Sequence, residues 1–264
     1  MAAIRTEITY VVRGESAVFN AADRAASYWP KEPHEVDVHD LRPEIDALAF
    51  DRNGFVVASE PSDAIGMTDP AARMAQFGRE AEALVARFTG AQKVISFGGM
   101  YRTDAPNSAD GNLPAFGAHV DYGARTVRDF TFDHFETDEA ERLLAGRHML
   151  INVWRPLKTV ERSPLALCDA STVSADDLFP SEVVGGLGDA KRRSLFGFNL
   201  AYDPAHRWTW LPHMQNDEAF VFRLYDSDQN AVQFTAHTAI EVPGTPSDAA
   251  PRESLEIRTI AFLV

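Results

Sequence analysis

Residues 148–154 read His148-Met149-Leu150-Ile151-Asn152-Val153-Trp154, a run whose interior is apolar except for one amide side chain. A short apolar run with β-branched and aromatic residues is typical of a β-strand. Similar segments, rich in Val, Ile, Phe and Trp and separated by Pro, Asp, Gly or Asn, lie at 164–168, 195–202, 208–211, 218–225, 231–240 and 254–264. Many short strands at this spacing favour a β-barrel or jelly roll over alternating β and α units.

The first half of the chain predicts a strand, a hairpin and a helix. Residues 6–12 are rich in β-forming residues, and 46–59 are typical of a hairpin whose turn contains Asn53-Gly54. An Asn-Gly pair supplies the positive φ angles that such a turn needs. From about Pro70 to Phe88, apolar residues recur at steps of three and four, which predicts a helix that ends at Gly90 and packs against a sheet.

The size of the chain indicates one domain. It has 264 residues, of which 45% are hydrophobic, and can therefore bury one substantial core. We expect a single domain over residues 1–264, mainly β with flanking helices. Residues 1–100 would supply N-terminal strands and the supporting helix, and residues 101–264 would form the jelly-roll core.

The composition excludes several classes of partner. The net charge is −14, the sequence pI is near 4.9, and the basic residues are scattered, so nucleic acid and anionic membranes are poor partners. The single cysteine, Cys168, lies in an apolar run and is interpreted as a small buried hydrophobe. The N-terminus lacks the pattern of an export signal, and no apolar run is long enough to span a membrane. We expect a cytoplasmic protein that acts on a small molecule, and the oligomeric state stays open.

A possible metal site begins in the segment Gly117-Ala118-His119-Val120-Asp121. On a strand, residues two apart point to the same face, so His119 and Asp121 can reach one ion. A site with two His and one carboxylate needs a third ligand from a distant strand, and His237 is well placed in the β-rich C-terminal third. This set is typical of a non-haem Fe(II) with positions open for a 2-oxo acid and O2.

The dyad alone is weak support, because in a chain with eight histidines about one His-x-Asp pair is expected by chance. His134-Phe135-Glu136 has the same ligand spacing and is an alternative dyad. It lies just before a helix predicted at 137–146, which has Thr137 as N-cap and Gly146 at its end. We therefore interpret 134–136 as a solvated entry to that helix.

An anion-binding pattern opens the last predicted strand. Arg252 and Ser254 share one strand face and could grip a carboxylate through a bidentate ion pair and one hydrogen bond. Glu256 and Arg258 continue on the same face, so Arg258 is an alternative carboxylate-binding residue. The other interpretation is a surface strand with compensating charges.

Several segments together carry a family resemblance. The most specific are the run from Asn152 to Pro156 and the segment from Arg252 to Arg258, taken together. The full set of segments is 49–55, 119–122, 151–157, 164–169, 217–218, 225–228, 237–239 and 252–258. From about residue 46 to the end, the chain resembles the CmcJ/AsaB family of iron- and 2-oxoglutarate-dependent oxygenases. The resemblance implies a double-stranded β-helix (jelly-roll, cupin-like) core.

The same resemblance implies the chemistry. Fe(II) would be bound by His119, Asp121 and His237, and 2-oxoglutarate by Arg252 with Ser254 or by Arg258. With O2, such enzymes hydroxylate or desaturate a C–H bond of a metabolite, typically in secondary metabolism, and release succinate and CO2. The substrate does not follow from the resemblance.

Four further residues are candidates for contact with the substrate: Tyr122, Asn152, Trp154 and Arg155. Tyr122 follows the metal carboxylate and would point away from the ligands unless the chain turns there. Trp154 and Arg155 could line the pocket beside the co-substrate, or Trp154 could be core while Arg155 caps the strand near Asp169.

Two other classes of function fit the same ligands. One is a jelly-roll hydrolase or isomerase that uses Zn or another divalent ion without 2-oxoglutarate. Zn prefers sites richer in His or Cys, and the arginine pattern would have no role there. The other is a binding module that has lost catalysis.

Overall fold

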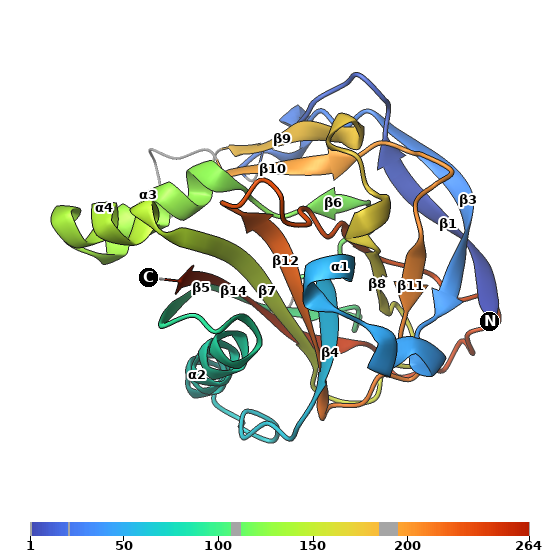
Figure 1. The fold of residues 1–264 in the computed structure, drawn as a ribbon. Helices are drawn as coiled ribbons and strands as arrows, with labels where there is room; N and C mark the ends of the chain where they lie inside the picture. Colours follow the sequence, from blue (N-terminus) through green and yellow to red (C-terminus); the bar gives the residue numbers. More distant parts are fainter. Residues whose placement is uncertain (1, 21, 107–111, 185–194, 264) are drawn as a thin grey trace.

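The computed structural model describes residues 2–20, 22–106, 112–184 and 195–263. In these residues the protein is mainly β, with two sheets and few helices (Figure 1). Across the larger sheet the strands are, in order, β1 (Ala3–Val11), β3 (Lys31–Asp40), β11 (Trp208–Trp210), β8 (Leu165–Cys168), β13 (His237–Ala239), β6 (His119–Val120), β10 (Leu195–Leu200), β9 (Leu178–Val184) and β2 (Ala17–Asn20). Across the smaller sheet they are β4 (Phe55–Ser59), β12 (Glu218–Asp226), β7 (Arg147–Pro156), β14 (Glu253–Leu263) and β5 (Lys93–Thr103).

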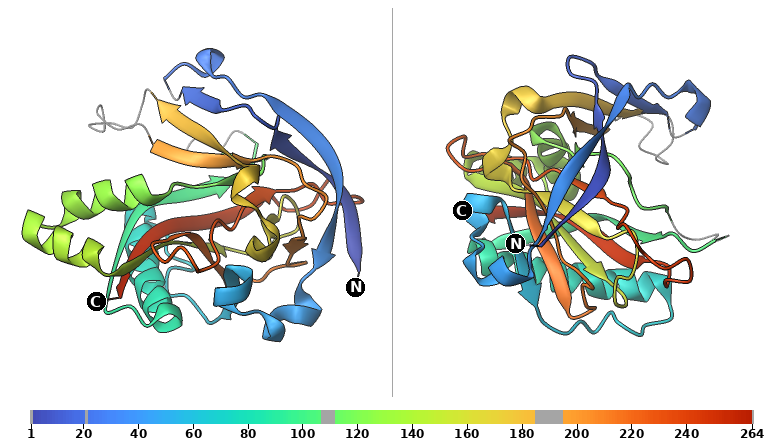
Figure 2. Two further views of the ribbon diagram at one scale, coloured as in Figure 1. Left: turned by 45° about the horizontal axis from the view of Figure 1, so that its top comes forward. Right: turned by 90° about the vertical axis from the view of Figure 1, so that its right-hand side faces the viewer.

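The helices lie outside the two sheets. They are α1 (Phe50–Asn53), α2 (Pro70–Thr89), α3 (Ala124–His134) and α4 (Thr137–Ala145), with short 3-10 turns at Arg24–Ala26, Arg42–Ala47, Ala170–Thr172 and Ala175–Asp177. Figure 2 shows α3 and α4 projecting together at one end of the molecule, and α2 running beneath the smaller sheet. The prediction of a mainly β protein with flanking helices is confirmed.

The central strand β7 explains why residues 148–154 are almost wholly apolar. Leu150 and Trp154 point to one side and join the core between the two sheets. Ile151 and Val153 point to the other side and pack with α2. Both faces of this strand are buried, so a polar side chain on either face needs a specific reason, and Asn152 is the buried polar residue within 148–154.

Helix α2 forms where its periodicity predicts it. Asp69 caps the N-terminus by accepting hydrogen bonds from the N–H groups of Ala71 and Ala72, and Gly90 ends the helix with a φ of 71°. Its apolar stripe, which includes Phe77 and Leu84, is buried against the outer face of the smaller sheet. Burial of this stripe against the strands supplies most of the stability that a surface helix lacks by itself.

The predicted hairpin at 46–59 is wrong. Residues 50–53 form the short helix α1, and Gly54 ends it with a φ of 81°. The Asn53 side chain accepts a hydrogen bond from the Ala49 N–H at 3.0 Å and donates one to Asp169 at 2.7 Å. The Asn-Gly pair therefore ends a helix, and the strand that follows pairs with the distant β12.

Gly54 is the glycine whose replacement we expect to destabilise the fold most clearly. A Cβ at this position would lie 2.5 Å from Thr235 Oγ1 and 2.8 Å from the Ala170 Cβ. Gly54→Ala should therefore cost about 2–4 kcal/mol in urea unfolding, from the positive φ and from the overlap. The control is Gly66→Ala, since Gly66 has a φ of 84° but no neighbouring atom within 4 Å. Equal losses for the two variants would contradict the expected overlap.

Other elements differ from the predictions in detail. The helix predicted at 137–146 is α4, which begins at Thr137 with Glu136 as the N-cap residue. Helix α3 was not predicted, and in place of the strand at 231–240 only His237–Ala239 is a strand.

Cys168 is buried, and burial raises the pKa of its thiol to about 12. Among the described residues, none of the helices has the length and apolar character that crossing a membrane requires.

Candidate metal centre

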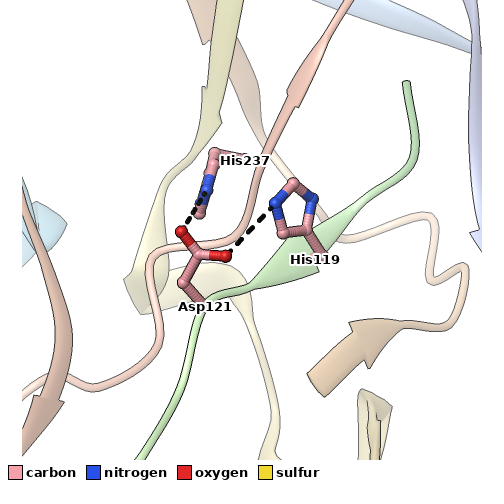
Figure 3. Close-up of side chains that lie close together, drawn as sticks. All are labelled: His119, Asp121 and His237. Carbon is pink, nitrogen blue, oxygen red and sulfur yellow. Dashed lines mark ion pairs between the residues drawn. The ribbon is translucent and has the colours of Figure 1, made fainter. Parts of the chain in front are cut away.

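Three side chains from two neighbouring strands converge on one point (Figure 3). His119 lies on β6, Asp121 follows the end of that strand, and His237 begins β13. His237 and His119 are directly opposite each other in the antiparallel pair of β13 with β6, so their side chains share one face of the sheet. One donor atom from each of the three residues lies within 4.8 Å of the others.

The distances leave room for an ion between the donor atoms. His119 Nε2 is 3.7 Å from Asp121 Oδ1, and His237 Nε2 is 3.7 Å from Asp121 Oδ2. The centroids of the two imidazole rings are 4.3 Å apart. In the described part of the chain this is the only such group of His, Cys, Asp and Glu side chains.

Backbone carbonyls fix the orientation of both imidazoles. His119 Nδ1 donates to the Gly117 carbonyl at 2.7 Å, and His237 Nδ1 donates to the Thr235 carbonyl at 3.3 Å. Because a carbonyl oxygen only accepts, Nδ1 of each ring carries a proton, which leaves Nε2 as the atom that can bind a metal. Burial, and then the neighbouring His237, lower the pKa of His119 to about 4, so His119 is neutral at neutral pH.

Asp121 is held by an arginine from the smaller sheet. Arg258 donates from Nη2 and from Nε to Asp121 Oδ2, at 2.7 and 3.2 Å. Burial by itself would raise the pKa of Asp121, but Arg258 and the two histidines hold it well below its usual range. The chain turns directly after this residue, because Tyr122 has a φ of 58°. Asp121 is therefore ionised, and one of its oxygens is already bound.

Comparison with known proteins gives this geometry a family. Residues 8–262 match a family described as "YDMC: Oxidoreductase/YMDC permease-like domain". The chain is 32% identical over 236 residues to the Fe(II)/2-oxoglutarate-dependent dioxygenase nvfI of Aspergillus novofumigatus. The aligned region covers 87% of this chain and 84% of that protein. This chain belongs to that dioxygenase family. The Fe(II)/2-oxoglutarate chemistry implied by the sequence resemblance is confirmed.

Other relatives agree with this assignment. The dioxygenase is 29% identical to the alpha-ketoglutarate-dependent dioxygenase tstK of Talaromyces stipitatus, over 92% of this chain and 91% of that protein. It is 35% identical to the hydroxylase/desaturase asaB of Aspergillus flavus over 49% of this chain and 62% of that protein. A solved structure of the iron and alpha-ketoglutarate-dependent endoperoxidase NvfI superposes with a TM-score of 0.89 at 28% identity, covering 100% of this chain and 98% of that one.

The two arginines that the sequence left as alternatives have different surroundings in the dioxygenase. Arg258 donates to Asp121, to Glu256 and to the Gly98 carbonyl, so its donors are occupied. Arg252 is buried, and its guanidinium donates to the Ser163 carbonyl at 2.7 Å. No carboxylate among the described residues forms an ion pair with Arg252.

A small cavity of the dioxygenase connects Arg252 with the metal centre. Its lining residues come from both sheets and are Arg102, Ala115, His119, Trp154, Leu165, His237, Ala239, Arg252 and Glu256. The Arg252 Nε and the Ser254 Oγ are buried and lack a hydrogen-bond partner among the described residues. Burial, and then Arg102, lower the pKa of Arg252 to about 10, which still leaves it charged at neutral pH. The cavity therefore combines a buried cation with the candidate metal ligands.

The four residues expected near the substrate lie in different places. Asn152 is buried opposite Phe222 and Arg258 in register, and neither atom of its amide has a partner among the described residues. Trp154 lines the cavity, and the Tyr122 ring lies 5.5 Å from the Arg258 guanidinium.

The expectation that Arg155 lines this pocket is corrected by the fold. Arg155 points to the opposite face of β7, where it donates to the carbonyls of Glu60 and Asn216. The alternative cap near Asp169 is not observed either, since these two carbonyls lie elsewhere in the chain.

The alternative metal dyad does not form a site. His134 ends α3, and Phe135 and Glu136 connect it to α4. Sequence reasoning also missed Phe222, whose ring centroid is 4.8 Å from that of His237. No local pattern marks Phe222, because it reaches the site only through the pairing of β12 with β7.

Proposed function

We propose that this dioxygenase binds Fe(II) through His119, Asp121 and His237 and oxidises a C–H bond of a small-molecule metabolite, by hydroxylation or desaturation. The donor set fits the ion, since two imidazole nitrogens and one carboxylate on one side of a metal are the ligands of non-haem Fe(II) oxygenases. Bound iron would supply the activation of O2, which converts 2-oxoglutarate to succinate and CO2. The convergence of the three donors within 4.8 Å carries the proposal.

Arg252 and Ser254 are proposed to bind the distal carboxylate of 2-oxoglutarate. A buried guanidinium without an anionic partner is costly, so its presence beside the metal centre favours a ligand that brings the missing charge. The Ser254 hydroxyl, which is also buried, can donate to the same carboxylate. Arg258 is less suitable, because its donors already bind Asp121, Glu256 and Gly98.

The remaining candidates are proposed to act around the reacting groups. The unpaired amide of Asn152 can bond to an oxygen of the co-substrate or substrate, and Trp154 supports Arg252 with its ring centroid 5.6 Å from the guanidinium. Tyr122 offers an aromatic surface beside Arg258. The similarity of the chain to the hydroxylase/desaturase asaB supports oxidation of a C–H bond by hydroxylation or desaturation.

We also propose that residues 1–264 form one oxygenase domain on a double-stranded β-helix core, with 1–100 as N-terminal strands and supporting helix. Strands from the first hundred residues and from the rest of the chain share both sheets, which supports this assignment. The site itself comes mainly from residues after 100, and α2 supports the outer face of the smaller sheet.

The test is an anaerobic titration of the metal-free protein with Fe(II) and then with 2-oxoglutarate. We expect a visible metal-to-ligand charge-transfer band that saturates at one equivalent of iron, followed by succinate release when O2 is admitted. Absence of the band, or activity with Zn and without 2-oxoglutarate, would overturn the proposal in favour of a hydrolase or isomerase.

A further inference from the structure

Four charged side chains form a continuous line between the metal centre and β5. Arg258 donates to Asp121 Oδ2 and, at 2.8 Å, to Glu256. Arg102 on β5 donates to both carboxylate oxygens of Glu256, each at 3.1 Å. The charges balance in pairs, with two guanidinium groups and two carboxylates, which makes their burial tolerable.

These ion-paired side chains also contact the segment that precedes the metal ligands. Arg102 Nη1 donates to the Leu113 carbonyl at 2.8 Å, a few residues before His119. The line therefore contacts the ligand-bearing chain on both sides of His119, at Leu113 and at Asp121. Side chains of Arg258 and Glu256 are only 3% and 7% exposed, so solvent competes little for these bonds.

The contacts of Arg258 distinguish the two oxygens of Asp121. Both donor atoms that reach this carboxylate bind Oδ2. Oδ1 lies 3.7 Å from His119 Nε2 and accepts no hydrogen bond from the described residues. Arg258 is itself immobilised, because its Nη1 donates to the Gly98 carbonyl at 2.8 Å. The carboxylate thus has one bound oxygen and one free oxygen.

We infer that Arg258 is a positioning residue that holds Asp121 as a ligand through Oδ1 alone, and that Glu256 and Arg102 hold Arg258 in place. The inference rests on the proposed role of Asp121 as a metal ligand. A carboxylate that is free to turn can bind an ion through both oxygens and so occupy one more position. Since 2-oxoglutarate needs two adjacent positions, one-oxygen binding by Asp121 keeps them available.

The test compares Arg258→Met and Arg258→Lys with the unchanged protein, using Co(II) alone and then Co(II) with 2-oxoglutarate. Visible absorption of bound Co(II) reports its coordination, and this readout does not depend on turnover. For Arg258→Met we expect an altered Co(II) spectrum and a dissociation constant for 2-oxoglutarate raised about tenfold or more. Arg258→Lys, which keeps one cationic donor, should recover part of both.

A matched control separates positioning from general damage to the sheet. Arg223 on β12 is also fully buried, and its ion-pair partners are Asp51 and Asp226. Arg223→Lys should leave the Co(II) spectrum unchanged. If Arg258→Met does not fold, Glu256→Gln weakens the same support and should shift the spectrum in the same direction.

The outcomes distinguish this inference from the function on which it rests. Failure of the unchanged protein to bind Co(II) would overturn the proposed metal site itself. Normal binding by the unchanged protein, together with unaltered Co(II) spectra and 2-oxoglutarate affinity in the Arg258 and Glu256 variants, would overturn only the positioning role.

Discussion

Replacement of His119 or His237 by Ala should abolish the charge-transfer band and succinate formation while the protein stays folded. Each imidazole supplies one of the three proposed donors, and its Nε2 forms no hydrogen bond with the described residues. Removal of a residue that only hydrogen-bonds to a metal ligand lowers activity about 10- to 100-fold, and the loss here should be larger. Anaerobic absorption and iron content after gel filtration measure the effect.

The matched control for these variants is His134→Ala. His134 belongs to the alternative dyad with the same spacing, but it lies at the end of α3. We expect unchanged iron binding in this variant. An iron content that falls in His134→Ala, or that persists in both His119→Ala and His237→Ala, would contradict the assignment of the ligands.

Arg252→Met should have the second large effect, and it should fall on 2-oxoglutarate rather than on iron. Loss of one partner from a buried, hydrogen-bonded charge pair costs about 2–5 kcal/mol, so the dissociation constant for 2-oxoglutarate should rise at least about thirtyfold. Arg252→Lys keeps the charge but loses the planar pair of donors, and should give an intermediate value. Iron binding without 2-oxoglutarate should be unchanged.

The stability of the Arg252→Met protein provides an independent check. In the protein without co-substrate, Arg252 is buried and has no carboxylate partner among the described residues. Its replacement by an apolar side chain should therefore lower the free energy of unfolding by less than about 1 kcal/mol, or raise it. A large loss of stability with an unchanged affinity for 2-oxoglutarate would instead indicate a purely structural residue.

Sequence reasoning reached the candidate metal centre partly through a short-range feature. The two-residue step from His119 to Asp121 is a property of any strand, and β6 is a strand at the first of these positions. The choice between Arg252 and Arg258 could not be made in this way. Arg258 lies on β14 and Arg252 directly precedes that strand. Only the contacts that the fold brings to each of them, Asp121 for Arg258 and the Ser163 carbonyl for Arg252, distinguish the two.

The errors in the predicted fold also arise from long-range contacts that the local sequence does not show. Asn53-Gly54 satisfies the local requirements of a hairpin turn and of a helix end equally well. The pairing of β4 with β12 decides between them, and it involves residues far away in the chain. Strand β3 was not predicted because half of its residues 31–40 are charged, and only Val36 and Val38 in it are buried hydrophobic residues.

The pairing of β6 with β13 has a consequence for the folding of the protein. These strands contain only two and three residues, so few backbone hydrogen bonds join them. An ion bound to both His119 and His237 would act as a cross-link between distant parts of the chain, much as a disulfide closes a loop. The binding free energy of iron would then also stabilise the pairing of β6 with β13, which few backbone hydrogen bonds support.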